Sequence, residues 1–141
     1  MAEIVYIGEA DDELDEFAGR SFAEHSAAHG IECGYCGFVF AAKENGKAVG
    51  VVQGYAYFDE VYISELIVSE EYRGRDIGTA LIKAVEEHFA GGRFDHISLT
   101  THRFQAAGFY EKCGFTTEFI RKSRKDPALD KYFMVKYINR Q

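Results

Sequence analysis

The sequence predicts an α/β fold, in which a mixed, mostly antiparallel and twisted sheet of about seven strands is flanked by helices. Residues 38–58 are rich in β-branched and aromatic side chains, and Asn45-Gly46 divides them as a two-residue hairpin turn would. After Arg73 the period changes, because apolar residues recur every four positions, at Ile77, Leu81, Val85 and Phe89. Strands joined by hairpins and followed by an amphipathic helix therefore form the centre of the predicted fold.

The remaining elements follow from the same patterns. We expect a strand over residues 3–7, a helix over 14–25, and a turn at Asp59-Glu60 before a strand over 61–68. Gly91-Gly92 ends the central helix. A strand around 97–99, a helix over 104–113, and two closing strands over 115–120 and 132–138 complete the chain.

The composition is that of one soluble globular domain. The chain has 141 residues, of which 47% are hydrophobic and 28% charged, with a single proline. We therefore expect one domain over residues 1–141. The first residues lack a basic segment followed by an apolar run, and no stretch has the length of a membrane span, so we expect a cytoplasmic protein without a membrane partner.

The charge excludes one large class of partner and favours another. A formal net charge of −7 argues against nucleic-acid binding, which needs clustered lysines and arginines. An acidic surface attracts a cationic substrate more readily.

The cysteines predict neither a disulfide framework nor a metal centre. Cys33-Gly34-Tyr35-Cys36 has the spacing of a zinc or redox motif, but Cys113 and the scattered histidines, including His25 and His29, supply no second pair of ligands. We expect no metal, and interpret the pair as small residues in a loop.

The segment from Arg73 to Thr79 has the features of a phosphate-binding loop. It joins a predicted strand to the start of a helix, where glycines let backbone N–H groups approach an anion. The helix N-terminus adds a favourable dipole, and two arginines add charge. A P-loop would need a Gly-Lys-Ser or Gly-Lys-Thr ending, and a dinucleotide-binding fold would need GxGxxG after its first strand; neither is present. The residues concerned are Arg73, Gly74, Arg75, Asp76, Ile77, Gly78 and Thr79.

This segment resembles the acyl-CoA-binding motif of the GNAT (N-acetyltransferase) superfamily, which reads Gln or Arg, two residues, Gly, one residue, then Gly or Ala. Arg73 and Gly78 match the ends of the motif, whereas Asp76 stands where the first glycine is usual. The resemblance implies that the cosubstrate is acetyl-CoA, and that the sheet is splayed at its binding site.

A second segment resembles the later motif of the same superfamily. There, a short helix ends in Tyr, Glu, Lys, any residue, Gly and Phe, which this chain carries from Tyr110 through Lys112 to Phe115. The resemblance implies that Tyr110 lies beside the sulfur of CoA and acts as general acid. The opposing interpretation is a core aromatic residue. An asparagine common in relatives, seven positions before this tyrosine, is replaced by Arg103.

The strand before the phosphate loop supplies further candidates. Period-two alternation places Ile63, Glu65 and Ile67 on one face, so Glu65 would interrupt an apolar row and have a raised pKa, as suits a base. A glutamate at a bulge or in a wet cleft explains the pattern equally well. The resemblance also implies that the backbone of Leu66, Ile67 and Val68 pairs with the pantetheine arm of CoA like an added strand.

Taken together, these patterns predict an acetyl-CoA-dependent N-acetyltransferase, in which a primary amine attacks the thioester directly. The alternative is a CoA-binding sensor or interaction domain without catalysis. We expect a small amine rather than a protein as acceptor. Three tyrosines could line its cleft or simply pack across strands: Tyr55, Tyr57 and Tyr62. A homodimer formed by a terminal strand is a further expectation.

Overall fold

The computed structural model describes residues 1–138 and divides them into two compact units. The first unit is Met1–Cys33, and the second begins at Gly34. Each unit is described by itself. The expectation of one domain over residues 1–141 stays a prediction.

The first unit contains one helix, α1 (Asp12–Ala28), which confirms the helix predicted here. The Asp11 carboxylate accepts a hydrogen bond from the Leu14 backbone N–H at 2.9 Å, and three acidic residues in the first turn complement the helix dipole. The strand predicted over residues 3–7 was wrong. These residues are exposed and form no strand, because β-propensity alone does not supply a neighbouring strand to pair with.

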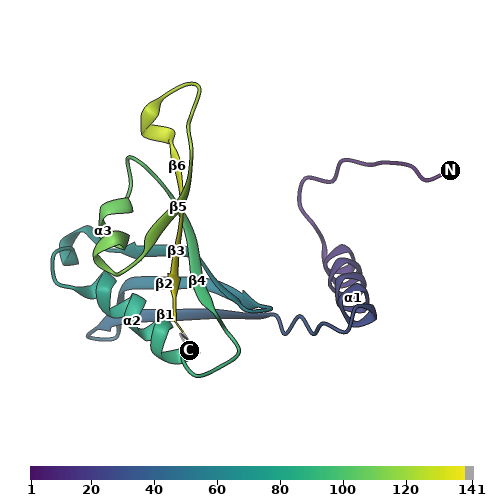
Figure 1. The fold of residues 1–141 in the computed structure, drawn as a ribbon, viewed down its shortest axis with the longest axis horizontal. Coiled ribbons are helices and arrows are strands. Elements are labelled where there is room, and N and C mark those ends of the chain that lie inside the picture. Colours follow the sequence, from purple (N-terminus) through teal and green to yellow (C-terminus); the bar gives the residue numbers. More distant parts are fainter. Residues whose placement is uncertain (139–141) are drawn as a thin grey trace. The chain divides into compact units, whose positions relative to one another are not determined.

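Within the described residues, the second unit contains a sheet of six strands (Figure 1), one fewer than predicted, because residues 3–7 form no strand. The strands lie in the order β1-β2-β3-β4-β6-β5, and every neighbouring pair is antiparallel except β3 and β4. Their bounds are β1 Cys36–Glu44, β2 Lys47–Tyr57, β3 Glu60–Val68, β4 His96–His102, β5 Thr116–Arg121 and β6 Lys131–Tyr137. Two short 3₁₀ turns, Glu70–Tyr72 and Pro127–Leu129, lie in the connections.

The predicted hairpin turn at Asn45-Gly46 is confirmed. Both residues have positive φ, 52° and 76°, as the two central positions of a tight hairpin turn require. The next turn lies one residue earlier than predicted. Phe58 and Asp59 form it, and Glu60 is already the first residue of β3.

The helix α2 (Ile77–Phe89) packs on one face of strands β1, β2 and β3. Its buried side chains are three of the predicted apolar stripe, Leu81, Val85 and Phe89, together with Ile82, and burial of each contributes about 1.5–3 kcal/mol. Ile77, the first residue of the stripe, is only half-buried. A second helix, α3 (Ala107–Lys112), joins the same core through Tyr110. The six-residue α3 is shorter than the predicted helix over 104–113, because Arg103 and Phe104 donate their backbone N–H groups to Asp130 and Ala128 instead of starting a helix.

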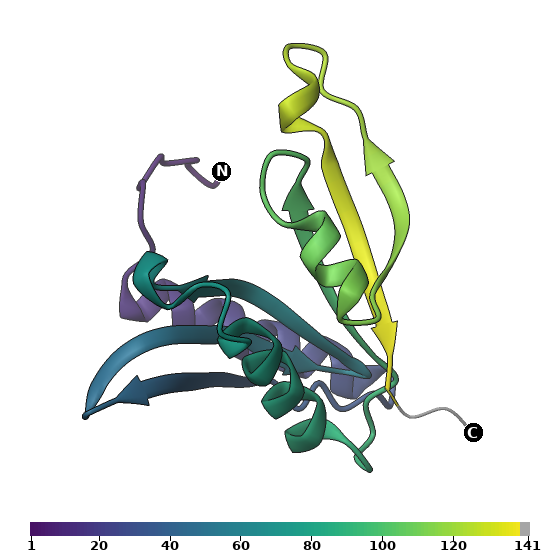
Figure 2. The same ribbon diagram turned by 90° about the vertical axis from the view of Figure 1, so that its left-hand side faces the viewer.

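The sheet splays between its two parallel strands, as expected. The pairing of β3 with β4 covers only Glu60–Tyr62 on β3 and His96–Ser98 on β4. Beyond these residues the two halves of the sheet diverge, and Figure 2 shows strands β1–β3 and strands β4–β6 as two arms of a V. The end of β3 therefore has a free edge.

A bulge in β3 changes which side chains face the core. Gln53 pairs with Glu65 and Gly54 pairs with Ile63, so Ser64 is an extra residue on β3, and its hydroxyl donates to the Gln53 carbonyl at 3.0 Å. A side chain at Gly54 would collide with the Tyr62 carbonyl, so the close approach of the two strands requires glycine there.

Candidate active site at the splayed strands

The predicted phosphate loop lies between the free edge of β3 and the start of α2. The first intrahelical hydrogen bond runs from the Ala80 N–H to the Asp76 carbonyl at 3.0 Å, so the backbone N–H groups of Ile77, Gly78 and Thr79 have no partner within the helix. Such groups, aligned with the helix dipole, favour an anion. The loop can therefore hold a phosphate through its backbone.

Asp76 is in the left-handed conformation, with φ 60° and ψ 18°. This explains why a glycine is usual at its position: only residues that tolerate positive φ fit there, and aspartate is one of the few others that do. Its side chain is exposed and caps no helix N–H, and among residues 1–138 it forms no ion pair. A carboxylate therefore stands uncompensated at the start of α2.

The two arginines of the loop are held in different ways. The Arg73 side chain folds back, and its Nε donates to the Val68 carbonyl at 3.3 Å, which joins the loop to the end of β3. The Arg75 guanidinium lies 4.8 Å from the centre of the Tyr72 ring in a cation–π contact. Both side chains are exposed.

The structure brings the two sequence motifs together. A Cβ at Gly78 would lie 3.0 Å from Cζ of Phe109, so the absence of a side chain at Gly78 lets α3 pack against the start of α2. One turn further along α3, the Thr79 hydroxyl hydrogen-bonds the Cys113 thiol. The predicted phosphate loop and the helix that carries Tyr110 thus lie in contact with each other.

Tyr110 is buried, with 7% of its surface exposed, and its ring contacts those of Phe109 and Phe115 edge-on. Burial, with a smaller contribution from the neighbouring Cys113, raises the pKa of Tyr110 to about 12. The phenol therefore keeps its proton at neutral pH and can act as a donor. Its place in the core confirms the interpretation of Tyr110 as a core aromatic residue, and its role as general acid stays a prediction.

The three backbone candidates of β3 lie in the unpaired part of the strand. Leu66, Ile67 and Val68 follow the last residue that pairs with β4, so their backbone faces the opening of the V on that side. Leu66 and Val68 are half-buried against the core, whereas the Ile67 side chain is 54% exposed on the opposite face of the sheet. Lys112, the last residue of α3, is exposed.

Glu65 does not lie in an apolar row, so this part of the sequence interpretation was wrong, and the alternative of a glutamate at a bulge is confirmed. The Ser64 bulge reverses the alternation: Ile63 is buried, while Glu65 and Ile67 face the open side of the sheet. Glu65 is exposed, and one of its carboxylate oxygens accepts a hydrogen bond from Gln53 Nε2 at 2.5 Å. Gln53 was missed in the sequence, although Gly54 within a predicted strand was a signal for a bulge beside it.

A polar cluster at the other end of β3 was also missed. Glu60 accepts hydrogen bonds from Ser98 Oγ at 2.5 Å and from His96 Nε2 at 3.3 Å, and His96 Nδ1 lies 3.0 Å from Asp95. Burial opposes the charge of Glu60, but hydrogen bonds from Ser98, Tyr57 and His96 outweigh it and lower its pKa. For His96, burial is outweighed by the bonds to Asp95 and Glu60, so the pKa is raised. These bonds join β3 to β4 where the V closes.

Three cysteine thiols are free: Cys33, Cys36 and Cys113. Burial raises the pKa of Cys113, although the hydrogen bond from Thr79 opposes this shift.

None of the described helices, within residues 1–138, is long and apolar enough to cross a membrane.

Comparisons with known proteins agree with this geometry. The model of the acetyltransferase (GNAT) family matches residues 7–115. A curated relative, described as an uncharacterised N-acetyltransferase of Methanocaldococcus jannaschii, is 24% identical over 131 residues, which cover 91% of this chain and 84% of the relative.

Two solved structures have the same fold. A proposed acetyltransferase from Agrobacterium tumefaciens superposes with a TM-score of 0.82 at 19% identity, covering 96% of this chain and 99% of that one. An aminoglycoside 6'-N-acetyltransferase complexed with coenzyme A superposes with a TM-score of 0.66 at 18% identity, covering 74% of each chain. The fold is thus that of an acetyltransferase with a mixed, mostly antiparallel sheet. The chain belongs to the GNAT family of N-acetyltransferases.

Proposed function

We propose that this protein transfers an acetyl group from acetyl-CoA to a primary amine, by direct attack of the amine on the thioester. The observation that carries this proposal is the joining of the free α2 N-terminus to the helix of Tyr110, through Gly78 and Phe109, beside the unpaired edge of β3. An anion site, a proton donor and an open strand edge therefore meet at the mouth of the V.

The chain's own groups fit the donor. The N–H groups of Ile77, Gly78 and Thr79 would bind its pyrophosphate, with Arg73 and Arg75 adding positive charge. The backbone of Leu66, Ile67 and Val68 would pair with the pantetheine arm, because this edge of β3 is not used by β4.

The chemistry then needs a base, an oxyanion donor and an acid. Acetyl-CoA supplies the electrophilic carbonyl carbon of its thioester. Glu65, or a water that it orders, would take the proton from the ammonium group, which leaves the amine nitrogen free to form the new C–N bond. A backbone N–H near Val68 would stabilise the negative charge on the carbonyl oxygen, and Tyr110 would protonate the sulfur as the C–S bond breaks. The second proton that the nitrogen loses on forming the amide would restore the phenol of Tyr110, through water.

The exposed position of Glu65 suits this base in one respect. A carboxylate on the open face of the sheet can be reached by an acceptor from solvent, and the bond from Gln53 fixes its orientation. The acceptor amine would then approach the thioester of acetyl-CoA, held within the V, from that face.

A second candidate function is a CoA-binding sensor or interaction domain without catalysis. Asp76 favours it, because an uncompensated carboxylate at the start of α2 would repel the pyrophosphate. A weak donor site is more compatible with sensing than with turnover at low donor concentration.

Two measurements distinguish these functions. Calorimetry with acetyl-CoA and with ATP tests the donor site, and a thiol-release assay over a panel of amines tests transfer. We expect acetyl-CoA to bind more tightly than ATP and an amine to accelerate thiol release. Binding without release on any amine would support the sensor, and equal binding of ATP would support a general phosphate site.

A further inference from the structure

A row of side chains on the open face of the sheet leads away from the splayed strands. Successive side chains of β2 point to opposite faces of the sheet, and Val52 and Ala56 are buried in the core on the face that α2 covers. Gln53, Tyr55 and Tyr57 therefore lie on the face opposite α2. Each has a partner directly across on β3, and these cross-strand pairs are Gln53 with Glu65, Tyr55 with Tyr62, and Tyr57 with Glu60. A carboxylate therefore stands at each end of the row, with aromatic rings between.

Tyrosine rings form the floor of this row. The Tyr55 ring lies 5.3 Å from the ring of Tyr62, 5.6 Å from that of Tyr35 and 5.7 Å from that of Tyr57, measured between ring centres. The Tyr35 pair is stacked, and the other two are tilted. Such rings offer flat apolar surface and an attractive π-face for a cation.

The end of the row near the closed part of the V is rich in carboxylates. Besides Glu60, this end carries Asp59, Asp95 and His96. One carboxylate oxygen of each aspartate and one ring nitrogen of His96 all lie within 4.8 Å of one another. Two basic side chains lie at the same end: His96, and Arg93, whose guanidinium donates to the Gly34 carbonyl at 2.7 Å. Three carboxylates thus face a histidine and one arginine already bound to backbone.

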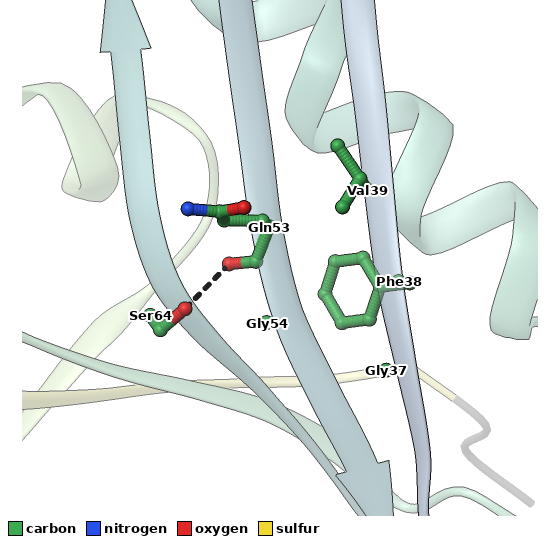
Figure 3. A pocket seen from close by; sticks show the side chains of 6 residues that line it. All are labelled: Gly37, Phe38, Val39, Gln53, Gly54 and Ser64. Carbon is green, nitrogen blue, oxygen red and sulfur yellow. Dashed lines mark hydrogen bonds between the residues drawn. The ribbon is translucent and has the colours of Figure 1, made fainter. Parts of the chain in front are cut away.

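The other end of the row lies at the candidate base. The side chain of Gln53 bonds Glu65, and beside it a hollow of about 300 Å³ opens on the sheet, lined by Gly37, Phe38, Val39, Gln53, Gly54 and Ser64 (Figure 3). The first unpaired residues of β3 follow Tyr62, so this end of the row adjoins the opening of the V. A molecule lying along the tyrosines would bring one terminus to Glu65.

We propose that the acceptor is an extended aliphatic amine with a second cationic group, bound along this row with its reactive amine at Glu65 and its distal cation at Asp59 and Glu60. The proposal rests on the acetyl transfer proposed above and names the class of acceptor for it. Gln53 and Tyr57 lie four residue steps apart on β2, which span about 13 Å at about 3.3 Å per step. Because the side chains at both ends reach inward, nitrogens about 8 to 10 Å apart would reach both ends. The net charge of −7 favours such a substrate during diffusion to the protein.

We expect two simpler classes of acceptor to bind less tightly than such a diamine. A simple alkylamine would satisfy Glu65 and the tyrosines but leave the carboxylates at the far end without a new partner. A planar aromatic amine could stack on Tyr55 but would carry no charge to Asp59. A positive charge at both ends of the molecule therefore distinguishes the proposed acceptor from these other amines.

The experiment compares linear diamines with n-alkylamines of the same carbon number, from four to ten carbons. Both series are assayed by thiol release, and both are titrated by calorimetry into the full chain saturated with CoA, which requires no turnover. We expect kcat/KM and affinity to be at least tenfold higher for the best diamine than for its matched monoamine, with an optimum in chain length.

Two variants locate the distal site. Asp59→Asn should raise the KM for the best diamine several-fold and leave the KM for its matched monoamine unchanged. Tyr55→Leu should raise both KM values. The matched control is Glu118→Gln, which removes an exposed carboxylate on β5 and should change neither KM.

The outcomes separate this proposal from the proposed function. Turnover of monoamines and diamines at equal kcat/KM would overturn the dication while acetyl transfer stood. Turnover of a lysine peptide faster than every diamine would also overturn it. If no amine is turned over, the calorimetric comparison still decides, because equal affinity of both series contradicts the row as a dication site.

Discussion

The ring of Phe109 occupies the space beside Gly78 that a side chain there would need. A Cβ at residue 78 would lie 3.0 Å from Cζ and 3.4 Å from Cε1 of Phe109. Gly78 therefore lets the helix of Tyr110 pack against the start of α2, and its role in binding a phosphate through its backbone N–H stays a prediction.

Gly78→Ala should separate these helices slightly and destabilise the protein. The added methyl group overpacks the contact, which costs about 1–3 kcal/mol and exceeds the gain of about 1 kcal/mol from the better helix propensity of alanine. Chemical denaturation measures the loss. The matched control is Gly108→Ala on α3, where a Cβ meets no heavy atom within 4 Å, so that variant should be as stable as the parent or more so. Equal stability of both variants would mean that the Phe109 contact is not tight.

Asp76→Asn should strengthen the binding of CoA. Asparagine tolerates the left-handed conformation seen at Asp76, and it removes a negative charge whose repulsion of a nearby phosphate is about 1 kcal/mol in water. We therefore expect the Kd for CoA to fall about two- to fivefold at low salt, with a smaller effect at high salt. Calorimetry at two salt concentrations measures both.

Asp76→Ala provides the control for backbone conformation. It removes the same charge but places a Cβ at φ 60°, which costs about 1–2 kcal/mol. This variant should have a lower Tm than the asparagine variant. If CoA binding does not change in either variant, the carboxylate of Asp76 points away from the phosphates.

Tyr110→Phe should reduce turnover and spare donor binding. Loss of a general acid lowers kcat by about 10²- to 10⁴-fold, whereas the ring contacts with Phe109 and Phe115 remain. We expect the Kd for CoA to stay within about twofold. Because the pKa of Tyr110 is about 12, its proton should not limit the parent's rate between pH 6 and 10. Tyr132→Phe, a half-buried tyrosine of β6, is the control, and equal kcat in all three proteins would remove Tyr110 from the mechanism.

His96→Gln should destabilise the protein more at pH 5.5 than at pH 8.5. The folded-state pKa of His96 is raised above its ordinary value of 6.5, so its contribution is fully present below pH 6.5 and is lost as pH rises through the folded pKa. Glu60 acts in the opposite direction, because its lowered pKa makes its contribution present above its ordinary value of 4.5 and lost at lower pH. Tm measured against pH for parent and variant should converge at alkaline pH, and a constant difference would contradict the bridge between β3 and β4.

Local chemistry made much of this fold predictable from the sequence. Asn45-Gly46 specifies a hairpin turn because both residues accept positive φ, and α2 follows from an apolar stripe that meets one face of the sheet. The resemblance of two motifs to one family predicted the splay. The hairpin turn and the helix depend on residues close together in the chain.

Features that depend on distant contacts were not predictable in the same way. One extra residue at Ser64 reverses the alternation of β3, so Glu65 is exposed instead of lying in an apolar row. The start of α3 is set by hydrogen bonds to Ala128 and Asp130, more than twenty positions along the chain. The roles of Glu65, Lys112 and the loop residues in binding, and the homodimer, stay predictions.

A crystal structure of this protein with CoA tests the central claim most directly. We predict the pyrophosphate within hydrogen-bond distance of the N–H groups of Ile77, Gly78 and Thr79, the pantetheine along the free edge of β3, and the sulfur beside the Tyr110 hydroxyl. A pyrophosphate bound elsewhere, or a sulfur on the far side of the sheet from Tyr110, would contradict the account.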